Sequence, residues 1–147
     1  ATKVGSILSN KENKIKDALE FYGKNLGLTF QIADDTLDYN SELKLFGKEI
    51  GNDFYEGKVT LPIILLYQKS NEDEKIKLKE LFKKKDRSVE EFKSILIMIK
   101  KYNIIFECYR KAEHFINLAS NSLSIFNKSK EKDMLQGLTS FSLERTF

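Results

Sequence analysis

The chain has 147 residues, of which 41% are hydrophobic and 32% charged, which is enough for one domain with a buried core over residues 1–147. Its formal net charge of +3 is too small to indicate nucleic-acid binding, and no apolar run approaches the ~20 residues of a membrane-spanning helix. The single cysteine, Cys108, excludes an internal disulfide and favours a reducing compartment. We therefore expect a cytoplasmic protein with no nucleic-acid partner and at most peripheral membrane contact.

Apolar side chains recur at helical spacing near the N-terminus. They form two successive sets: Ile15, Ala18, Leu19 and Tyr22, then Leu26, Phe30, Ala33 and Leu37. Gly23 and Gly27 lie where the two sets meet and weaken helix propensity there. Two alternatives stay open, because the glycines fit either a turn between two helices or a place where helices pack closely.

Residues 40–57 lack this periodicity. Glycines at positions 47, 51 and 57 lie among lysines, which predicts a turned loop and the best candidate for a functional loop. Thr60 and Pro62 then mark a helix start, because proline fits the first turn, where its missing N–H costs nothing. The apolar segment 63–66 predicts that this helix is central and buried.

Two later helix starts are predicted by residues that can cap a helix N-terminus. Asn71 precedes three acidic residues, and Ser88 precedes Glu91 at capping-box spacing. Apolar stripes predict further helices over 92–102 and 105–127, and a short last helix is expected to bury three side chains: Leu135, Leu138 and Phe141. No sustained alternation of period two occurs, so we predict an all-α fold, a helical bundle of about seven helices.

An acidic face is predicted on the helix that ends near position 38. Asp34 and Asp38 are one turn apart, Gln31 precedes Asp34 on nearly the same side, and Asp35 lies to the flank. Like charges at this spacing repel by roughly 0.2 to 0.5 kcal/mol per pair, so a cation should offset them. Mg²⁺ fits, because it takes one or two carboxylates together with water and phosphate oxygens.

Lysines in the following loop complement this acidic face. Lys48 and Lys58 flank the glycine-rich turn, and a metal-bridged diphosphate needs point positive charges of this kind. Taken singly, each of these residues is explained equally well by a solvated surface position. The register of the whole set favours a metal and diphosphate site.

Two motifs carry a resemblance to a known family. The segment FQIADDTLDY, residues 30–39, resembles the second aspartate-rich motif of the trans-prenyl diphosphate synthases. The segment GKEIGNDFYEGKVTLP, residues 47–62, resembles the Gly-Lys loop that follows it at the same distance, and its details are closest to bacterial octaprenyl enzymes. The resemblance implies the C-terminal half of the isoprenoid synthase fold.

The resemblance also implies roles for the acidic and basic residues. Asp34 would bind Mg²⁺ directly, with Asp38 and Asp35 holding it directly or through water. Gln31, Lys48 and Lys58 would contact the allylic diphosphate, which gives the two lysines a catalytic role. The implied reaction condenses isopentenyl diphosphate with an allylic diphosphate. Enzymes of the family generally form homodimers, so a second copy is one expected partner.

The family's first aspartate-rich motif and its isopentenyl-diphosphate segment do not occur in these residues. We therefore expect the chain alone to be inactive and to expose an apolar surface. Three accounts stay open: half of a split enzyme that works with an N-terminal complementing chain, a degenerate product, or a noncatalytic subunit that binds metal and diphosphate weakly. A different alternative is an unrelated helical protein that binds Mg²⁺ or a partner.

Overall fold

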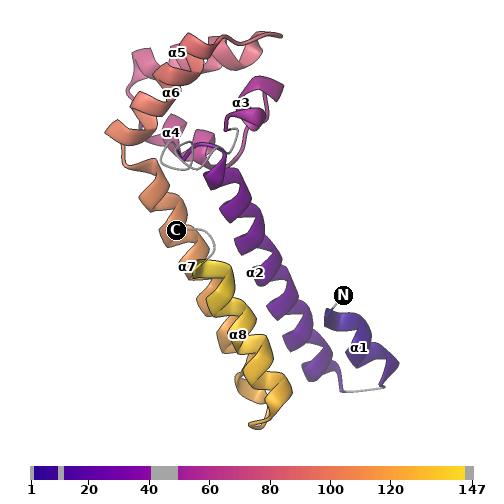
Figure 1. The fold of residues 1–147 in the computed structure, drawn as a ribbon. Helices are drawn as coiled ribbons and strands as arrows, with labels where there is room; N and C mark the ends of the chain where they lie inside the picture. Colours follow the sequence, from indigo (N-terminus) through magenta and orange to yellow (C-terminus); the bar gives the residue numbers. More distant parts are fainter. Residues whose placement is uncertain (1, 10–11, 41–49, 145–147) are drawn as a thin grey trace. The chain divides into compact units, whose positions relative to one another are not determined.

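The computed structural model describes residues 2–9, 12–40 and 50–144, with side chains to residue 142. These residues form α1 (Thr2–Leu8), α2 (Asn13–Leu37), α3 (Asn52–Glu56), α4 (Leu61–Lys69), α5 (Glu72–Lys83), α6 (Val89–Lys101), α7 (Ile104–Ser122), the 3₁₀ turn η2 (Leu123–Ile125) and α8 (Lys130–Glu144) (Figure 1). Every regular element among them is helical, so the predicted all-α fold is confirmed. None of these helices is long and apolar enough to cross a membrane.

The described chain divides into two compact units. One contains the residues up to Ala33 and from Arg110 onward, and the other contains Asp34–Tyr109. The expectation that residues 1–147 act as one domain remains a prediction.

Of the two alternatives for the glycines, a turn between helices does not occur, because α2 runs continuously from Asn13 to Leu37. Close packing explains Gly23: a Cβ there would lie 2.2 Å from Oγ1 of Thr2, whose hydroxyl donates to the carbonyl of Leu19 at 2.7 Å. Gly27 has no such neighbour within 4 Å. The glycine at 23 therefore lets α1 approach α2, at a position where glycine costs roughly 1 kcal/mol of helix propensity.

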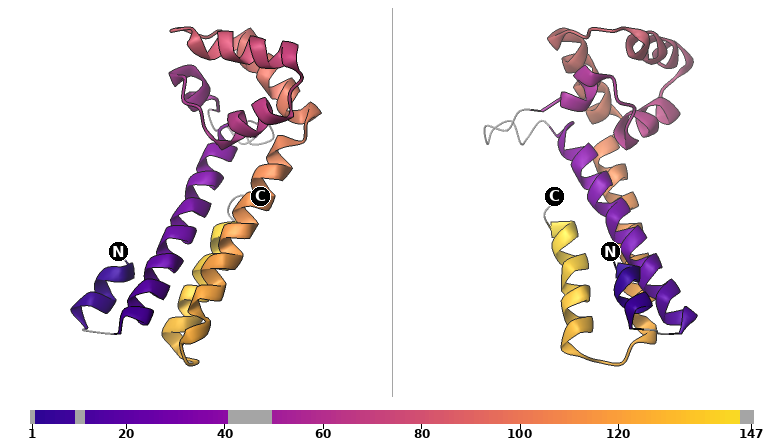
Figure 2. Two further views of the ribbon diagram at one scale, coloured as in Figure 1. Left: turned by 180° about the vertical axis from the view of Figure 1, so that it is seen from behind. Right: turned by 90° about the vertical axis from the view of Figure 1, so that its right-hand side faces the viewer.

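The first unit is built around a core shared by α2, α7, η2 and α8. Its fully buried members are Tyr22, Ala119 and Leu123, against which Leu19, Leu26, Phe126 and Leu135 pack. The Tyr22 hydroxyl also donates to the carbonyl of Leu135 at 2.8 Å, which links α2 to α8. After η2 the chain reverses, and α8 runs antiparallel to α7 (Figure 2).

The predicted burial of Leu138 and Phe141 is wrong. These side chains are 47% and 55% exposed, whereas Thr139 and Ser142 of the same helix are buried. The hydroxyl groups of Thr139 and Ser142 donate hydrogen bonds to the carbonyls of Gln136 and Leu138 on the same helix. Because these polar groups are hydrogen-bonded, burying them costs little free energy. α8 consequently faces inward with Leu135, Thr139 and Ser142, while Leu138 and Phe141 lie on its exposed side.

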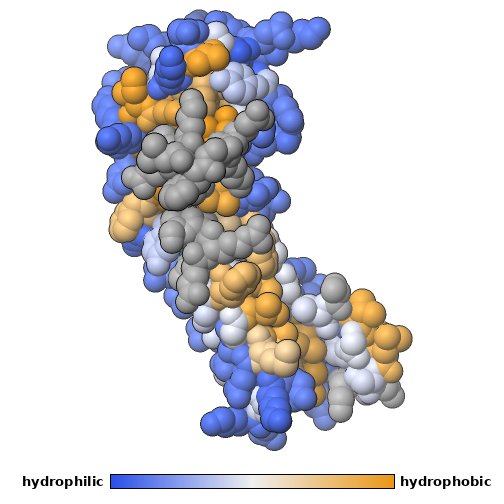
Figure 3. Space-filling model, viewed as in Figure 1, coloured by the Kyte–Doolittle hydropathy of each residue, from blue (hydrophilic) through white to orange (hydrophobic). Residues whose placement is uncertain are grey.

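Further apolar side chains are exposed on α1 and α2. Phe30, a member of the second apolar set, is 39% exposed, and on α1 the exposed fractions of Val4, Ile7 and Leu8 reach 82%. Figure 3 shows apolar surface at the position of α1. The described residues thus show the exposed apolar surface that the sequence predicts.

The second unit is organised by capped helices and an aromatic cluster. α4 begins at Leu61 with Pro62 in its first turn, the predicted N-cap Asn71 is confirmed and forms a capping box, and the predicted capping box of Ser88 is present. Phe54 of α3 is fully buried, with ring centroids 5.9 Å from Phe82 of α5 and 5.2 Å from Phe92 of α6. This cluster is the base on which α3 rests.

Glu74 joins the start of α5 to the end of α6. Its carboxylate accepts hydrogen bonds from the Lys101 ammonium at 2.7 Å, the Tyr102 hydroxyl at 2.5 Å and the backbone N–H of Asn71 at 3.1 Å. These donors, with Lys101 the strongest, lower the pKa of Glu74 to about 2. Glu74 is therefore ionised in the folded protein at neutral pH.

We predict opposite effects for two glycine substitutions in α2. Gly23→Ala should displace α1 because its Cβ collides with Thr2, and amide hydrogen exchange in α1 should accelerate. Gly27→Ala is the matched control, and it should stabilise the protein by up to about 1 kcal/mol through helix propensity. Equal exchange in α1 for the two variants would contradict the packing at Gly23.

We predict that the stability lost in Glu74→Gln depends on pH. Because the folded pKa of Glu74 lies below its ordinary value of 4.5, its stabilising effect is fully present above pH 4.5 and is lost as pH falls toward 2. The urea midpoint of Glu74→Gln should be below that of the wild type at pH 7, and the gap should close in acid. Glu80→Gln, at an exposed position of α5, is the control. A gap that does not change with pH would contradict this role.

Candidate functional site

The acidic residues at the end of α2 differ in exposure. Gln31 and Asp34 are exposed, Asp38 is half-buried and Asp35 is buried. This matches the predicted helical face, in which Gln31, Asp34 and Asp38 follow one another along the outer side and Asp35 lies to the flank. Asp34 therefore presents its carboxylate to solvent, where a ligand can reach it.

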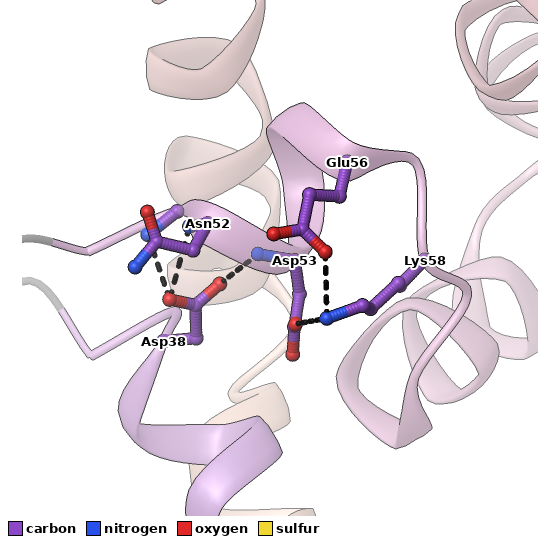
Figure 4. Close-up of polar contacts among 6 residues, drawn as sticks. Asp38, Asn52, Asp53, Glu56 and Lys58 are labelled. Carbon is purple, nitrogen blue, oxygen red and sulfur yellow. Dashed lines mark hydrogen bonds and ion pairs between the residues drawn. The ribbon is translucent and has the colours of Figure 1, made fainter.

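Asp38 is bound to the loop that follows it. Its Oδ1 accepts the N–H groups of Gly51 at 3.0 Å and Asn52 at 3.1 Å, and its Oδ2 accepts the N–H of Asp53 at 2.8 Å (Figure 4). The Gly51 N–H also lies 2.9 Å from the Asp38 carbonyl. Asp38 thus satisfies the unpaired N–H groups at the start of α3, a task usually done by a residue adjacent in sequence.

Two glycines give the loop its shape. Gly51 has φ of +93° and Gly57 has φ of +76°, a region that favours glycine. A Cβ on Gly51 would lie 2.7 Å from the ring of Phe92, so the glycine also permits the loop to rest on the aromatic cluster. Gly57 ends α3, and its N–H donates to the Phe54 carbonyl at 3.0 Å.

Lys58 follows immediately and is paired with acidic residues of α3. Its ammonium lies 2.7 Å from Glu56 and 3.1 Å from Asp53, as Figure 4 shows. The hydrogen bonds to Glu56 and Asp53 raise the pKa of Lys58 above its ordinary value. Lys58 is therefore cationic at neutral pH and lies in the same loop that Asp38 anchors.

Tyr39 closes the inner side of this region. Its ring is almost fully buried, 6.1 Å between centroids from Phe92. Burial, together with the nearby charges of Asp38 and Asp53, raises the pKa of the phenol. The tyrosine therefore remains neutral and serves as a packing residue beneath the acidic motif.

The structure brings part of the predicted set together. Asp38 and Lys58 meet through the loop 51–58, with Asp53 linking them. Lys48 lies outside the described residues. Sequence reasoning did not assign Asp53 or Glu56, whose only signal was their position within the motif of residues 47–62.

The carboxylates of the acidic motif are the candidate ligands for Mg²⁺. Among the residues that the structure describes, no group of three or more His, Cys, Asp or Glu side chains forms a ready metal cage. A carboxylate offers about four lone-pair positions, and Asp38 uses three on backbone N–H groups. Mg²⁺ needs only one or two protein carboxylates when water and phosphate oxygens complete its shell, so Asp34 and the remaining position on Asp38 are the candidates that would hold it.

Comparisons with other sequences point to one family. The polyprenyl synthetase profile matches residues 1–99. A short chain isoprenyl diphosphate synthase of Methanocaldococcus jannaschii is 33% identical over 144 residues, 98% of this chain and 43% of that protein. An octaprenyl diphosphate synthase of Haemophilus influenzae is 26% identical over 147 residues, which is 100% of this chain and 44% of that relative.

Solved structures show the same fold. A decaprenyl diphosphate synthase from Rhodobacter capsulatus has a TM-score of 0.90 at 29% identity, covering 99% of this chain and 45% of that one. A polyprenyl synthase from Caulobacter crescentus, complexed with calcium and isoprenyl diphosphate, has a TM-score of 0.84 at 28% identity, covering 99% and 44%. The chain thus spans less than half the length of these relatives, as the resemblance to half of the fold predicted.

We predict that Asp34 and Asp38 differ in their effect on stability. Asp38→Asn should lower the free energy of unfolding by about 1 kcal/mol, because one amide oxygen cannot replace two carboxylate oxygens that accept three N–H groups. Asp34→Asn, at an exposed position on the same helix, should change it by less than about 0.5 kcal/mol. Urea unfolding measures both, and equal effects would contradict the anchoring role of Asp38.

Proposed function

Because the chain belongs to the polyprenyl synthetase family, we propose that it carries the allylic-diphosphate side of a Mg²⁺-dependent prenyltransferase site. The supporting observation is the bonding of Asp38 to Gly51, Asn52 and Asp53. It connects the acidic motif to the loop that carries Lys58, so the metal-binding and anion-binding parts of the proposed site are held as one piece.

The proposed reaction starts with loss of diphosphate from an allylic substrate, which leaves an allylic cation. The double bond of isopentenyl diphosphate attacks this cation, a new carbon–carbon bond forms, and loss of a proton regenerates a double bond. Mg²⁺, when bound, neutralises the departing diphosphate and orients it. Apolar helix surfaces exclude the water that would otherwise trap the cation.

Each residue of the predicted set has a role in this proposal. Asp34, the exposed carboxylate of the three, would hold the metal directly, and Asp38 and Asp35 would hold it directly or through water. Lys58 supplies a positive charge to the diphosphate. The diphosphate then competes with Glu56 and Asp53 for the Lys58 ammonium. Gln31 on the exposed face of α2 donates its amide N–H, and Lys48 contributes a second ammonium.

A second candidate is a binding subunit without turnover. It needs only the acidic motif and the loop that carries Lys58, both of which occur in these residues. In this case the chain binds Mg²⁺ and diphosphate but elongates a substrate only with a complementing N-terminal chain. The resemblance also implies a homodimer, in which a second copy of the chain would be the partner.

We predict Mg²⁺-dependent binding of farnesyl diphosphate, measured by isothermal titration of the purified chain with MgCl₂ or with EDTA. Asp34→Asn should weaken binding at least about tenfold by removing a metal ligand, and Lys58→Met should do so by removing a charge. Asp73→Asn, at an exposed position of α5, is the charge-matched control and should bind like the wild type.

Product analysis with isopentenyl diphosphate separates the two candidates. The chain alone should form no elongated product, and elongation by the chain alone would rule out the binding-subunit candidate. Binding that does not require Mg²⁺, or that survives Asp34→Asn unchanged, would contradict the proposed site itself.

A further inference from the structure

Arg87 reaches the loop of the proposed site from the segment between α5 and α6. Its Nη1 donates to the carbonyl of Tyr55 at 3.4 Å, near the end of α3, and its Nη2 donates to the carbonyl of Phe82 at 3.0 Å, near the end of α5. One guanidinium therefore joins the C-terminal turns of two helices, where carbonyls lack partners within their own helix and favour a positive charge.

Aromatic rings hold the guanidinium in place. Its carbon lies 5.2 Å from the ring centroid of Phe82 and 5.9 Å from that of Phe54. Both rings belong to the aromatic cluster that supports α3. A planar guanidinium can stack on these rings and donate to two diverging carbonyls at once, which a lysine ammonium cannot do in the same way.

Gly57 touches the guanidinium at the point where the chain turns toward Lys58. A Cβ at position 57 would lie 2.7 Å from Nη2 of Arg87 and 2.8 Å from Nη1. The next N–H, that of Lys58, donates to the carbonyl of Asp53 at 2.9 Å. The missing side chain at Gly57 thus lets Arg87 pack directly against the backbone that leads into Lys58.

We propose that Arg87 is a positioning residue for Lys58: it fixes the end of α3 and the turn at Gly57, and so the direction in which the lysine leaves the loop. Asp38 anchors the start of the same segment and Arg87 anchors its end. That Lys58 binds a diphosphate rests on the proposed function. That Arg87 fixes the turn at Gly57 rests on the fold alone.

Hydrogen exchange tests the fixed turn without any ligand. In Arg87→Ala the amides of Gly57 and Lys58 should exchange at least about tenfold faster, while amides in α4 and α6 keep their protection. Lys79→Ala is the control, since it removes a cation 5.3 Å from the Tyr67 ring without touching α3. If Arg87→Ala fails to fold, Arg87→Lys replaces it, with faster exchange at the same two amides expected.

A double-mutant cycle tests whether Arg87 acts through Lys58. Introduced into the wild-type chain, Arg87→Ala should weaken Mg²⁺-dependent farnesyl diphosphate binding several-fold. Introduced into the Lys58→Met variant, it should weaken binding no further. Unchanged exchange at Gly57 and Lys58, a uniform loss of protection throughout residues 50–109, or equal weakening in both backgrounds would overturn the proposal. A wild type that binds no diphosphate would contradict the proposed function, and the exchange result would then decide the role of Arg87 alone.

Discussion

The candidate site depends on one carboxylate. Asp38 stands at the end of the acidic motif and accepts three consecutive backbone N–H groups that begin at Gly51. Without it, the N–H groups of Asn52 and Asp53 at the start of α3 would lose this acceptor, and only the bond from the Gly51 N–H to the Asp38 carbonyl would remain of this set. The acidic motif thus has a structural task that is separate from the proposed metal binding, and its carboxylate Asp34 is exposed to solvent.

The rest of the loop is built to hold that arrangement. Gly51 rests on Phe92 and Gly57 rests on Arg87, each at a positive φ and each with no room for a Cβ. The aromatic cluster beneath them is supported by α5 and α6, which Glu74 ties together. Lys58 therefore leaves a segment that is fixed at both ends, and its ammonium is held by Glu56 and Asp53 of the same segment. This preorganisation suits a site that must orient a diphosphate.

Local signals predicted much of this from sequence. Pro62, Asn71 and Ser88 act through neighbours in the chain, so their helix starts were predicted correctly. Features that depend on distant partners were missed: Gly23 gives no local sign of Thr2, nothing near Asp38 signals that it caps α3, and the apolar residues Leu138 and Phe141 look like core until α8 is seen to pack through Thr139 and Ser142. The acidic face was predictable because helical spacing alone sets it, whereas the support from Arg87 required the fold.

A crystal structure with Mn²⁺ and a non-hydrolysable allylic diphosphate analogue tests the central claim most directly. The account predicts anomalous density for the metal beside Asp34, the diphosphate against the loop with Lys58 turned from Glu56 toward it, and Asp38 still bonded to residues 51–53. Metal and diphosphate bound elsewhere, or Asp38 released from the loop to surround the metal, would contradict it.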